Sequence, residues 1–436
     1  MILANRYNYP VSFHHKSAET LETALNTVPA YSSWKAIDPG KTAAIDNRYD
    51  AMPELTKQII RDNFPAGLIP NYRDLDEGLR LEEIEYTFTS GTTGERVVNI
   101  WNQAWWDAAE AASWKLNTSL TQLDYPQKEA ILASSLNVGI CCEEDLPMGY
   151  RTFGHKLYLN EKINLIQWQH RHYVRMAKEL QSFQPVILEA NPSLLARFAF
   201  WAMEEGVEVY SPAVIVFTYE FISSIHVAAI KKVFSSSIVS SFGTTETGFV
   251  LEECEKGLFH QNIEFCRIDF MPLKKEYGGP ELGQMLVTTF DNPWNSVIKF
   301  GTGDLVRLYG SGECRCGRNE GLIASAVEGR VTNSTFSTDG QLVTTQAVDK
   351  TLAEIKGIQD YHLEQNTRTQ YELHLMIGKD GNSSIICDEA RHALELLFGR
   401  DGVFNIRILS SILPGPAGKF RRTQANFDFD IRGLFE

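Results

Sequence analysis

The chain has 436 residues, of which 43% are hydrophobic and 22% are charged, a composition typical of a soluble globular protein that is long enough for two or more domains. Its formal net charge of −14 argues against nucleic acid and anionic membranes as general partners. The sequence has no basic segment followed by an apolar run at its start and no stretch of about 18 apolar residues, so we expect a cytoplasmic protein.

The first motif in chain order is a turn rich in hydroxyl groups and glycine, set between two segments that we expect to be strands. It comprises Thr89, Ser90, Gly91, Thr92, Thr93 and Gly94. The glycines permit positive φ and a close approach of the backbone, while main-chain N–H groups and hydroxyls can donate to phosphate oxygens. The motif therefore predicts a phosphate-binding turn, and a plain Ser/Thr-rich surface turn is the alternative interpretation.

Downstream of this turn, apolar runs alternate with amphipathic stretches. The expected strands are 130–133, 185–188, 213–217 and 237–240, and the expected helices are 102–117, 173–183 and 193–205. This βαβ rhythm predicts a parallel sheet, which gathers ligands at the carboxyl ends of its strands, where 189–192 and 218–220 lie.

The pattern changes twice toward the C-terminus. After about residue 237 short strands and turns follow, and a smaller segment with its own strand and helix begins near residue 330. We therefore expect an α/β protein with a large N-terminal domain of layered sheets and helices over 1–329 and a small α+β C-terminal domain over 330–436.

Three further motifs carry polar side chains that suit a nucleotide. Phe242-Gly243-Thr244-Thr245-Glu246 follows the last expected strand of the parallel sheet, and the carboxylate of Glu246 could hold Mg²⁺ on a nucleotide phosphate. Asp304 is predicted to end a strand, where it could accept hydrogen bonds from ribose hydroxyls. Lys419 lies on a loop rich in glycine and proline near the C-terminus. Taken alone, the first two motifs are also typical of ordinary turns, and a lysine near the C-terminus is more often simply solvated.

Taken in this order and at these separations, the four motifs resemble the adenylate-forming superfamily, which includes acyl-CoA synthetases and the adenylation domains of peptide synthetases. The resemblance extends from about residue 50 to residue 425. Within the superfamily the chain is most similar to the phenylacetate-CoA ligase branch, through its short length, Glu253-Cys254, and the segments 257–260 and 313–318. The resemblance implies that the large domain binds ATP and a carboxylic acid, and that the small domain rotates between two half-reactions.

The resemblance also implies a role for each motif. In the reaction a carboxylate attacks the α-phosphate of ATP and pyrophosphate leaves, so catalysis consists of positioning and charge stabilisation. Lys419 would bridge the acid and the α-phosphate. The other implied contacts are the turn from Thr89 to Gly94 with the β- and γ-phosphates, Thr244 and Thr245 with the α-phosphate or the adenine side, Phe242 and Gly243 with the nucleotide, Glu246 with Mg²⁺, and Asp304 with the ribose.

We expect an aryl or arylacetic acid as the substrate and CoA as the first-choice acceptor. One alternative is an adenylase of natural-product or antibiotic biosynthesis that passes the acyl group to a carrier protein, a protein thiol, an amine or a reductase. The alternative from a different class is a nucleotide-binding protein without turnover.

Three features depart from the family pattern. They are Glu95-Arg96 after the phosphate turn, Lys299 and Gly301 before Asp304, and Thr332-Asn333 in place of an acidic hinge pair. We expect these departures to affect the second half-reaction, and CoA as the acceptor, more than they affect adenylation.

The seven cysteines are an odd number and are better explained as thiols or metal ligands than as a disulfide framework. Cys254 and His260 form a Cys-x₅-His pair, and Cys314 and Cys316 form a Cys-x-Cys pair, each on a turn-rich segment. The two pairs could converge into a tetrahedral zinc site of the structural type, and the phenylacetate-ligase branch often shows the same pattern. The alternative is that these reduced cysteines pack as small buried hydrophobic residues.

Overall fold

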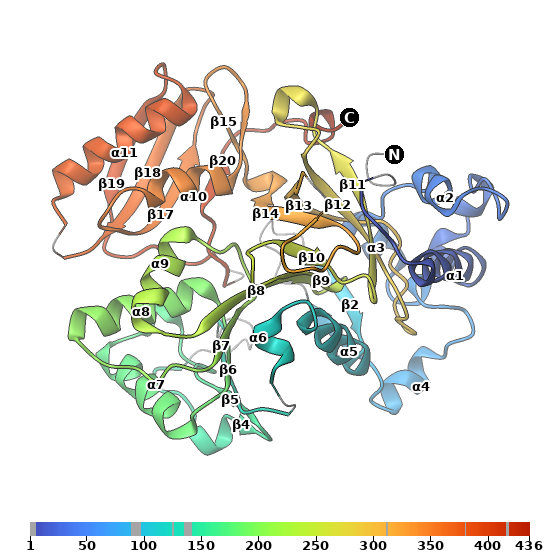
Figure 1. Ribbon diagram of the computed structural model, residues 1–436, viewed down its shortest axis with the longest axis horizontal. Coiled ribbons are helices and arrows are strands. Elements are labelled where there is room, and N and C mark those ends of the chain that lie inside the picture. The colour runs from blue at the N-terminus through green and yellow to red at the C-terminus, as the bar shows by residue number, and fades with distance from the viewer. Residues whose placement is uncertain are drawn as a thin grey trace.

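The computed structural model describes residues 6–88, 97–123, 126–134, 142–310, 313–379, 381–415 and 418–436. Its centre is a sheet of 12 strands, and a separate sheet of four strands lies at one end of the molecule (Figure 1). Helices pack against both sheets. The α/β fold expected from the sequence is confirmed.

One half of the central sheet is the parallel part that the βαβ rhythm predicts. Its strands lie in the order β5 (Lys156–Tyr158), β3 (Glu129–Leu132), β6 (Ile187–Ala190), β7 (Val214–Phe217) and β8 (Ser237–Thr244), with β4 (Thr152–Phe153) antiparallel at the edge. The helices of this half are α7 (His170–Phe183), α8 (Pro192–Glu205) and α9 (Ser224–Val233). Apolar side chains of α7 and α8 form one buried core with one face of the strands. The predicted strands and helices therefore agree with the observed ones to within a few residues.

The other half of the central sheet is antiparallel and begins with the second part of β8. Residues 237–240 of β8 pair with β7, whereas residues 241–244 pair with β9 (Gly248–Glu253). The remaining strands follow in the order β10 (Phe259–Gln261), β14 (Ile323–Arg330), β13 (Phe300–Leu308), β12 (Leu282–Thr289) and β11 (Cys266–Pro272). Because one strand takes part in both halves, the two halves form a single sheet.

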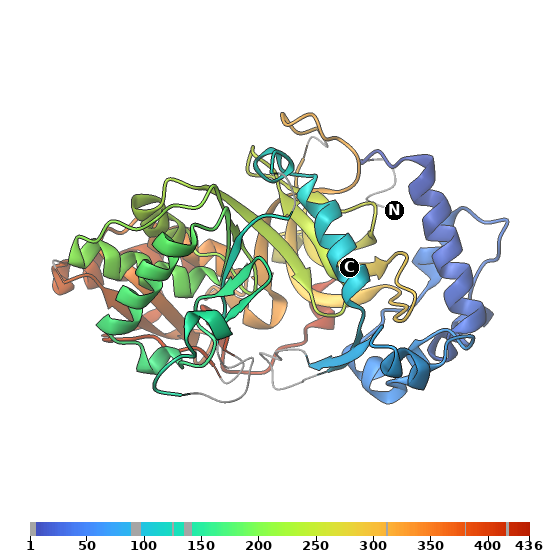
Figure 2. The same ribbon diagram turned by 90° about the horizontal axis from the view of Figure 1, so that it is seen from below.

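The N-terminal helices gather at the end of the molecule opposite the four-stranded sheet (Figure 2). They are α1 (Val11–Thr27), α2 (Ile45–Ala51), α3 (Lys57–Asn63) and α4 (Leu75–Arg80), and the hairpin of β1 (Glu85–Phe88) and β2 (Val98–Trp101) follows them. Next come α5 (Gln103–Trp114), as expected over 102–117, and α6 (Thr118–Thr121). In the described ranges, none of the helices is both long enough and apolar enough to cross a membrane.

The C-terminal part of the chain forms the four-stranded sheet and its helices. Its elements are β15 (Thr335–Phe336), β16 (Leu342–Val343), α10 (Thr345–Ala353), β17 (Ile358–Gln365), β18 (Gln370–Ile377), α11 (Ser383–Phe398), β19 (Val403–Ile408) and β20 (Thr423–Ala425). The sheet order is β19-β18-β17-β20, and its apolar face forms a core with α10 and α11. We call β15 to β20 with α10 and α11 the small unit, and the residues up to Arg330 the large unit.

The small unit docks on α9 of the large unit (Figure 1). Ile225 of α9 belongs to the core of the small unit. The carboxylate of Asp349, on α10, accepts hydrogen bonds from the Ser223 hydroxyl and from the Ser224 N–H at 2.7 Å. A residue of the small unit therefore satisfies donors at the N-terminus of a helix in the large unit.

The last residues of the chain leave the small unit and return to the large unit. Phe435 bridges Leu273 beyond the end of β11, and the Lys274 N–H donates to the Leu434 carbonyl at 2.9 Å. The Glu436 N–H donates to the Pro272 carbonyl at 3.1 Å. Leu434 and Phe435 are buried in an apolar cluster with residues of the large unit. The C-terminal tail is thus a second attachment of the small unit to the large unit.

Candidate active site

The two strands expected around the phosphate turn are present as the antiparallel hairpin β1–β2, in which Phe88 pairs with Val98. The turn itself, from Thr89 to Gly94 with Ser90, Gly91, Thr92 and Thr93, and the following Glu95-Arg96 lie outside the described residues. The hairpin therefore supports the expected setting of the motif, and phosphate binding by the turn stays a prediction.

Glu246 lies in the turn that joins β8 to β9 and is 6% exposed. The hydroxyls of Thr244 and Thr247 share a hydrogen bond of 2.9 Å across this turn. Both flanking glycines are required, since a Cβ at Gly243 would lie 2.3 Å from the Gly248 carbonyl oxygen and a Cβ at Gly248 would lie 2.8 Å from the Trp105 ring. The glycines of this motif thus permit a close backbone approach that holds Glu246 at the edge of the parallel sheet.

Asp304 lies in the middle of β13, not at the end of a strand as expected from the sequence. It is opposite Arg330 of β14, and its Oδ1 is 3.6 Å from the Arg330 Nε. The other oxygen, Oδ2, is buried and has no hydrogen-bond partner among the described residues. A buried acceptor of this kind costs free energy unless a ligand donates to it.

Lys419 comes from the small unit and lies within electrostatic reach of four charged residues of the large unit. Burial lowers the pKa of its ammonium below the ordinary value, and Arg330 lowers this pKa further. The carboxylates of Glu220, Asp304 and Glu246 act in the opposite direction. The structure therefore places Lys419 within electrostatic reach of the predicted residues Asp304 and Glu246.

Glu220 is a member of this group to which the sequence analysis gave no role. It follows β7, and its Oε2 accepts a hydrogen bond of 2.9 Å from the backbone N–H of Phe420, the residue after Lys419. The only signal in the sequence is its place at the carboxyl end of a predicted parallel strand. The contact joins residues 200 positions apart, so chain patterns could not predict it.

Lys299 and Gly301, one of the departures from the family pattern, have a structural explanation. The Lys299 ammonium is buried and donates to the carbonyls of Tyr49 at 2.7 Å and Met52 at 2.8 Å, at the end of α2. A Cβ at Gly301 would lie 1.8 Å from Oε1 of Glu54. Lys299 therefore fixes the end of α2 next to β13, and Gly301 leaves room for the Glu54 side chain.

A group of charged side chains lies on the face of the parallel strands that is turned toward α5. Glu129 of β3 pairs with Lys156 of β5 at 3.1 Å, and Glu189 of β6 accepts from the Thr218 hydroxyl at 3.0 Å. Burial, with Glu189 and Glu129 nearby, raises the pKa of Glu110 on α5 to about 8. Burial and Glu189 raise the pKa of Glu129 to about 7. Glu110 and Glu129 therefore hold protons at pH values where a free glutamate is ionised.

Aromatic rings line the neighbouring part of α5. The Trp106 ring centroid is 4.1 Å from that of Trp101 and 5.0 Å from that of Phe249, which follows Gly248 at the start of β9. Tyr219 precedes Glu220 and adopts a φ of +77°, which is unusual for a non-glycine residue. Phe242 of β8 packs against the apolar cluster of the antiparallel half. Phe242 on β8 and Phe249 on β9 thus lie next to the turn that holds Glu246.

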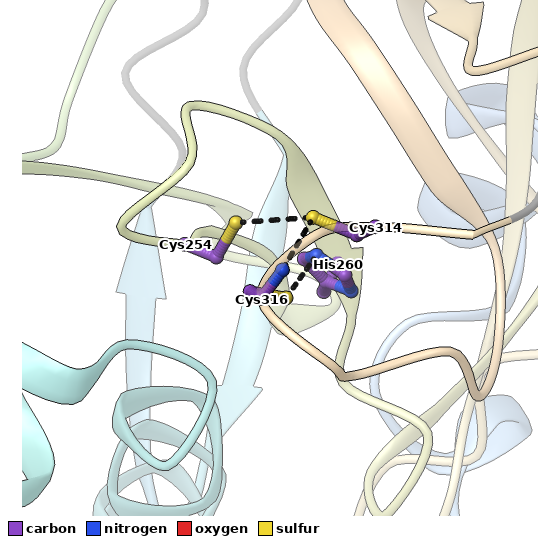
Figure 3. Close-up of side chains that lie close together, drawn as sticks. All are labelled: Cys254, His260, Cys314 and Cys316. Carbon is purple, nitrogen blue, oxygen red and sulfur yellow. Dashed lines mark hydrogen bonds between the residues drawn. The ribbon is translucent and has the colours of Figure 1, made fainter.

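The four candidate metal ligands converge in the antiparallel half of the sheet (Figure 3). The ligand atoms of Cys254, His260, Cys314 and Cys316 all lie within 4.8 Å of one another. The Cys254 Sγ is 3.7 Å from the Cys314 Sγ, and the Cys316 Sγ is 3.4 Å from the His260 Nε2. Burial, with a contribution from Arg318, lowers the pKa of His260 to about 4, so its imidazole is neutral and able to coordinate at Nε2.

The cysteines of this cluster are presented by two turns with the same local sequence pattern, Cys-x-x-Gly. In the first turn the Lys256 N–H donates to the Cys254 Sγ at 3.4 Å, and Gly257 has a φ of +76°. In the second turn the Cys316 N–H donates to the Cys314 Sγ at 3.5 Å, and Gly317 has a φ of +85°. This repeated pattern is visible in the sequence and indicates two similar ligand-bearing turns. Three thiols and one imidazole in this arrangement fit a closed tetrahedral zinc site.

Comparisons with known proteins place the fold. No family model matches the sequence. Among curated proteins, the chain is 21% identical over 403 residues to Protein CapK of Staphylococcus aureus, a match that covers 88% of this chain and 81% of that protein.

Solved structures give a closer match in three dimensions. The crystal structure of 2-hydroxyisobutyryl-CoA ligase in the postadenylation state, in complex with 2-HIB-AMP, has a TM-score of 0.72 at 14% identity and covers 97% of this chain and 91% of that chain. The same ligase in the thioesterification state has a TM-score of 0.57 at 16% identity, covering 96% of this chain and 91% of that chain. The amide bond synthetase McbA from Marinactinospora thermotolerans has a TM-score of 0.51 at 14% identity, covering 84% and 71%.

The chain therefore has the fold of the adenylate-forming enzymes, as the resemblance of its motifs predicted. The TM-score is higher for the postadenylation state of that ligase than for its thioesterification state.

The raised pKa of Glu110 should make the free energy of unfolding depend on pH. Its folded-state pKa of about 8 lies above the unfolded value, so its contribution is fully present below about pH 4.5 and is lost as the pH rises toward 8. Glu110→Gln removes this loss, and we expect the variant to gain about 1–2 kcal/mol over the wild type between pH 5 and pH 8, after allowance for solvent screening. Urea unfolding at several pH values measures the difference. The exposed control Glu389→Gln should show no such trend, and a constant difference for Glu110→Gln would contradict the prediction.

Proposed function

We propose that this chain activates a carboxylic acid with ATP. A carboxylate oxygen of the acid attacks the α-phosphorus, the bond from that phosphorus to the bridging oxygen of the β-phosphate breaks, and pyrophosphate leaves with the electron pair. The product is an acyl-adenylate. The observation that carries the proposal is that Lys419 lies within electrostatic reach of Asp304 and Glu246, residues from motifs far apart in the chain.

The proposed role of each residue follows from its chemistry. Lys419 places a compact positive charge at the transferring phosphate, where negative charge develops in the transition state. Asp304 accepts from the ribose hydroxyls, which would satisfy its buried and unpartnered Oδ2. Arg330 beside Asp304 adds a second positive charge at the same place.

Mg²⁺ is the metal that this chemistry implies, and the residue that fits it is Glu246. Its carboxylate is buried within electrostatic reach of Lys419 and receives no hydrogen bond in the described part of the chain. Mg²⁺ is commonly bound by one or two carboxylates together with substrate phosphates. When bound, the ion would neutralise part of the phosphate charge, while Glu246, Thr244 and Thr245 would fix the nucleotide at the hairpin turn.

We propose in addition that the boundary between two domains lies at residues 329/330 and that the small unit reorients after adenylation. The proposal is supported by the separate core of the small unit and by the two TM-scores against one ligase in two states. A lysine brought by a separable unit can be withdrawn before the acyl group is transferred.

For the acid we propose an aryl or arylacetic class, which the aromatic side chains of Trp106 and Phe249 next to Gly248 would accommodate. For the acceptor we propose CoA first and an amine second, since structures of similar fold include a CoA ligase and an amide bond synthetase. The residues that would distinguish these acceptors, including Thr332-Asn333 at the junction, are the ones that depart from the family pattern.

Acid-dependent exchange between ATP and pyrophosphate, measured over a panel of carboxylic acids, tests the proposal. Exchange with at least one acid supports adenylation, and binding of ATP without exchange for any acid would favour a nucleotide-binding protein without turnover. Mass spectrometry after addition of CoA or of amines then identifies the acceptor.

Lys419→Ala should lower the exchange rate by about 10²-fold or more, because one preorganised charge at the reacting phosphate is lost. Circular dichroism and ATP binding should stay near the wild type. Lys350→Ala, which removes an exposed lysine of the same unit, is the control and should retain full exchange. Wild-type exchange in Lys419→Ala would remove this residue from the mechanism.

Glu246→Gln keeps the size of the side chain but removes the charge that a hard cation needs. We expect exchange to slow by roughly 10²-fold and added Mg²⁺ to restore part of the loss. Exchange rates measured over a Mg²⁺ titration test this, with the exposed Glu276→Gln as the control. A variant with the wild-type rate and the wild-type Mg²⁺ dependence would show that Glu246 only shapes the turn.

We also propose that Cys254, His260, Cys314 and Cys316 bind one structural zinc ion. The close approach of their ligand atoms and the paired Cys-x-x-Gly turns support this proposal. A closed four-ligand site leaves no open coordination position, so the ion would stabilise the loops and take no part in acyl transfer.

Protein purified without chelator should contain about one equivalent of zinc, measured by mass spectrometry of the metal. Cys314→Ser should lose the metal and melt at a lower temperature, whereas Cys387→Ser, a cysteine outside the cluster, should keep it. A wild-type protein without zinc, or a Cys314→Ser variant with full metal content, would refute the site.

A further inference from the structure

We infer that Glu220 is a positioning residue, which holds the Lys419 loop of the small unit in place for adenylation through hydrogen bonds to the loop backbone and to Ser193. The inference deepens the proposed function and rests on it. Glu220 belongs to the large unit, directly after β7, and the loop belongs to the small unit.

The contact fixes the backbone next to the lysine. Oε2 of Glu220 accepts from the Phe420 N–H at 2.9 Å, and Oε1 accepts from the hydroxyl of Ser193, which is 0% exposed. With both oxygens engaged, the carboxylate has one orientation. A hydrogen bond to a charged acceptor is stronger than a neutral one, so the position of Phe420 N, and of the residue before it, is well defined.

The contact continues into a buried polar network across the two units. The guanidinium of Arg422 donates to the Ser193 hydroxyl and to Asp360 of β17. His226 of α9 approaches the same Asp360, with its Nε2 at 3.4 Å from Oδ1. Arg422, Asp360 and His226 are each 2% exposed. Partners inside such a network are costly to remove, so the network holds Ser193 and Glu220 against the loop.

The side chain of Phe420 is also held, through contacts of its ring with two arginines. Its ring centroid is 5.2 Å from the guanidinium carbon of Arg197 on α8 and 5.3 Å from that of Arg422. Arg197 also donates to the Ile412 carbonyl, which precedes the loop. The residue after Lys419 is thus fixed at its N–H by Glu220 and at its ring by two arginines.

The charge of Glu220 has an effect apart from its hydrogen bonds. Together with Asp304 and Glu246 it raises the pKa of Lys419, against burial and Arg330, which lower it. A neutral residue that keeps the hydrogen bonds should therefore leave the loop in place and let Lys419 lose its proton at a lower pH. The two effects can be separated by substitution.

The experiment compares Glu220→Ala with Glu220→Gln in two measurements. The first is hydrogen exchange of the backbone amides of 418–422, which needs no activity. The second is acid-dependent exchange between ATP and pyrophosphate over a range of pH. Glu220→Ala should lose protection at Phe420 and lower kcat by about 10- to 100-fold, with the KM for ATP changed by less than about 3-fold, because positioning and not binding is lost.

Glu220→Gln can accept from the Phe420 N–H and donate to the Ser193 oxygen. It should keep the protection and at least about a third of the wild-type kcat at neutral pH, while the alkaline limb of its pH profile shifts to lower pH. Glu204→Ala is the matched control, since Glu204 pairs across the two units with Lys379 at 2.9 Å on the same large-unit surface. It should leave the protection of 418–422 and the kcat unchanged.

The inference is overturned if Glu220→Ala keeps the protection of 418–422 or keeps the wild-type kcat, if Glu220→Gln falls as low as Glu220→Ala, or if Glu204→Ala has the same effect. If the wild type shows no exchange with any acid, the proposed function fails. The amide protection then still decides whether Glu220 holds the loop.

Discussion

In the proposed reaction, Lys419 must keep its proton although it is buried away from water. Burial and the nearby Arg330 lower the pKa of Lys419, and three carboxylates offset part of this lowering. Glu220 follows β7, Glu246 lies in the β8–β9 turn and Asp304 lies on β13. The charge of one side chain therefore depends on three separate elements of the large unit being held at the same place.

The strand β8 makes this arrangement possible. Its first half belongs to the parallel part of the sheet, where Glu220 follows the carboxyl end of β7. Its second half begins the antiparallel part, which contains Asp304. A break between the two sheets would let these residues move relative to one another. Gly243 and Gly248 help to hold Glu246 in this arrangement, because only glycine permits the close contacts that form the turn around it.

The sequence predicted correctly those features that depend on short stretches of the chain. The parallel strands, their helices and the pairing of Cys254 and His260 with Cys314 and Cys316 follow from short patterns, and the structure has all of them. One local inference needed correction, since Asp304 lies within a strand and not at its end.

What the sequence could not predict depends on contacts between distant parts of the chain. Glu220 meets Phe420 across 200 positions, and Asp349 of the small unit accepts from the Ser224 N–H at the start of α9. No periodicity or turn pattern encodes such a contact, because it exists only after the units have docked. The raised pKa of Glu110 has the same origin, since Glu129 and Glu189 approach it only in the folded sheet.

The return of the C-terminal tail limits how the small unit can move. The unit is joined to the large unit by the chain at Arg330 and again by the tail at Phe435. A unit that is tethered at two points has a smaller range of rotation than a unit tethered at one point, unless one attachment is released. Releasing the tail would break backbone hydrogen bonds of about 1 kcal/mol each and expose two apolar side chains at about 2 kcal/mol each. The free energy of that step, on the order of several kcal/mol, would set an upper bound on how often a widely rotated arrangement is populated in this chain.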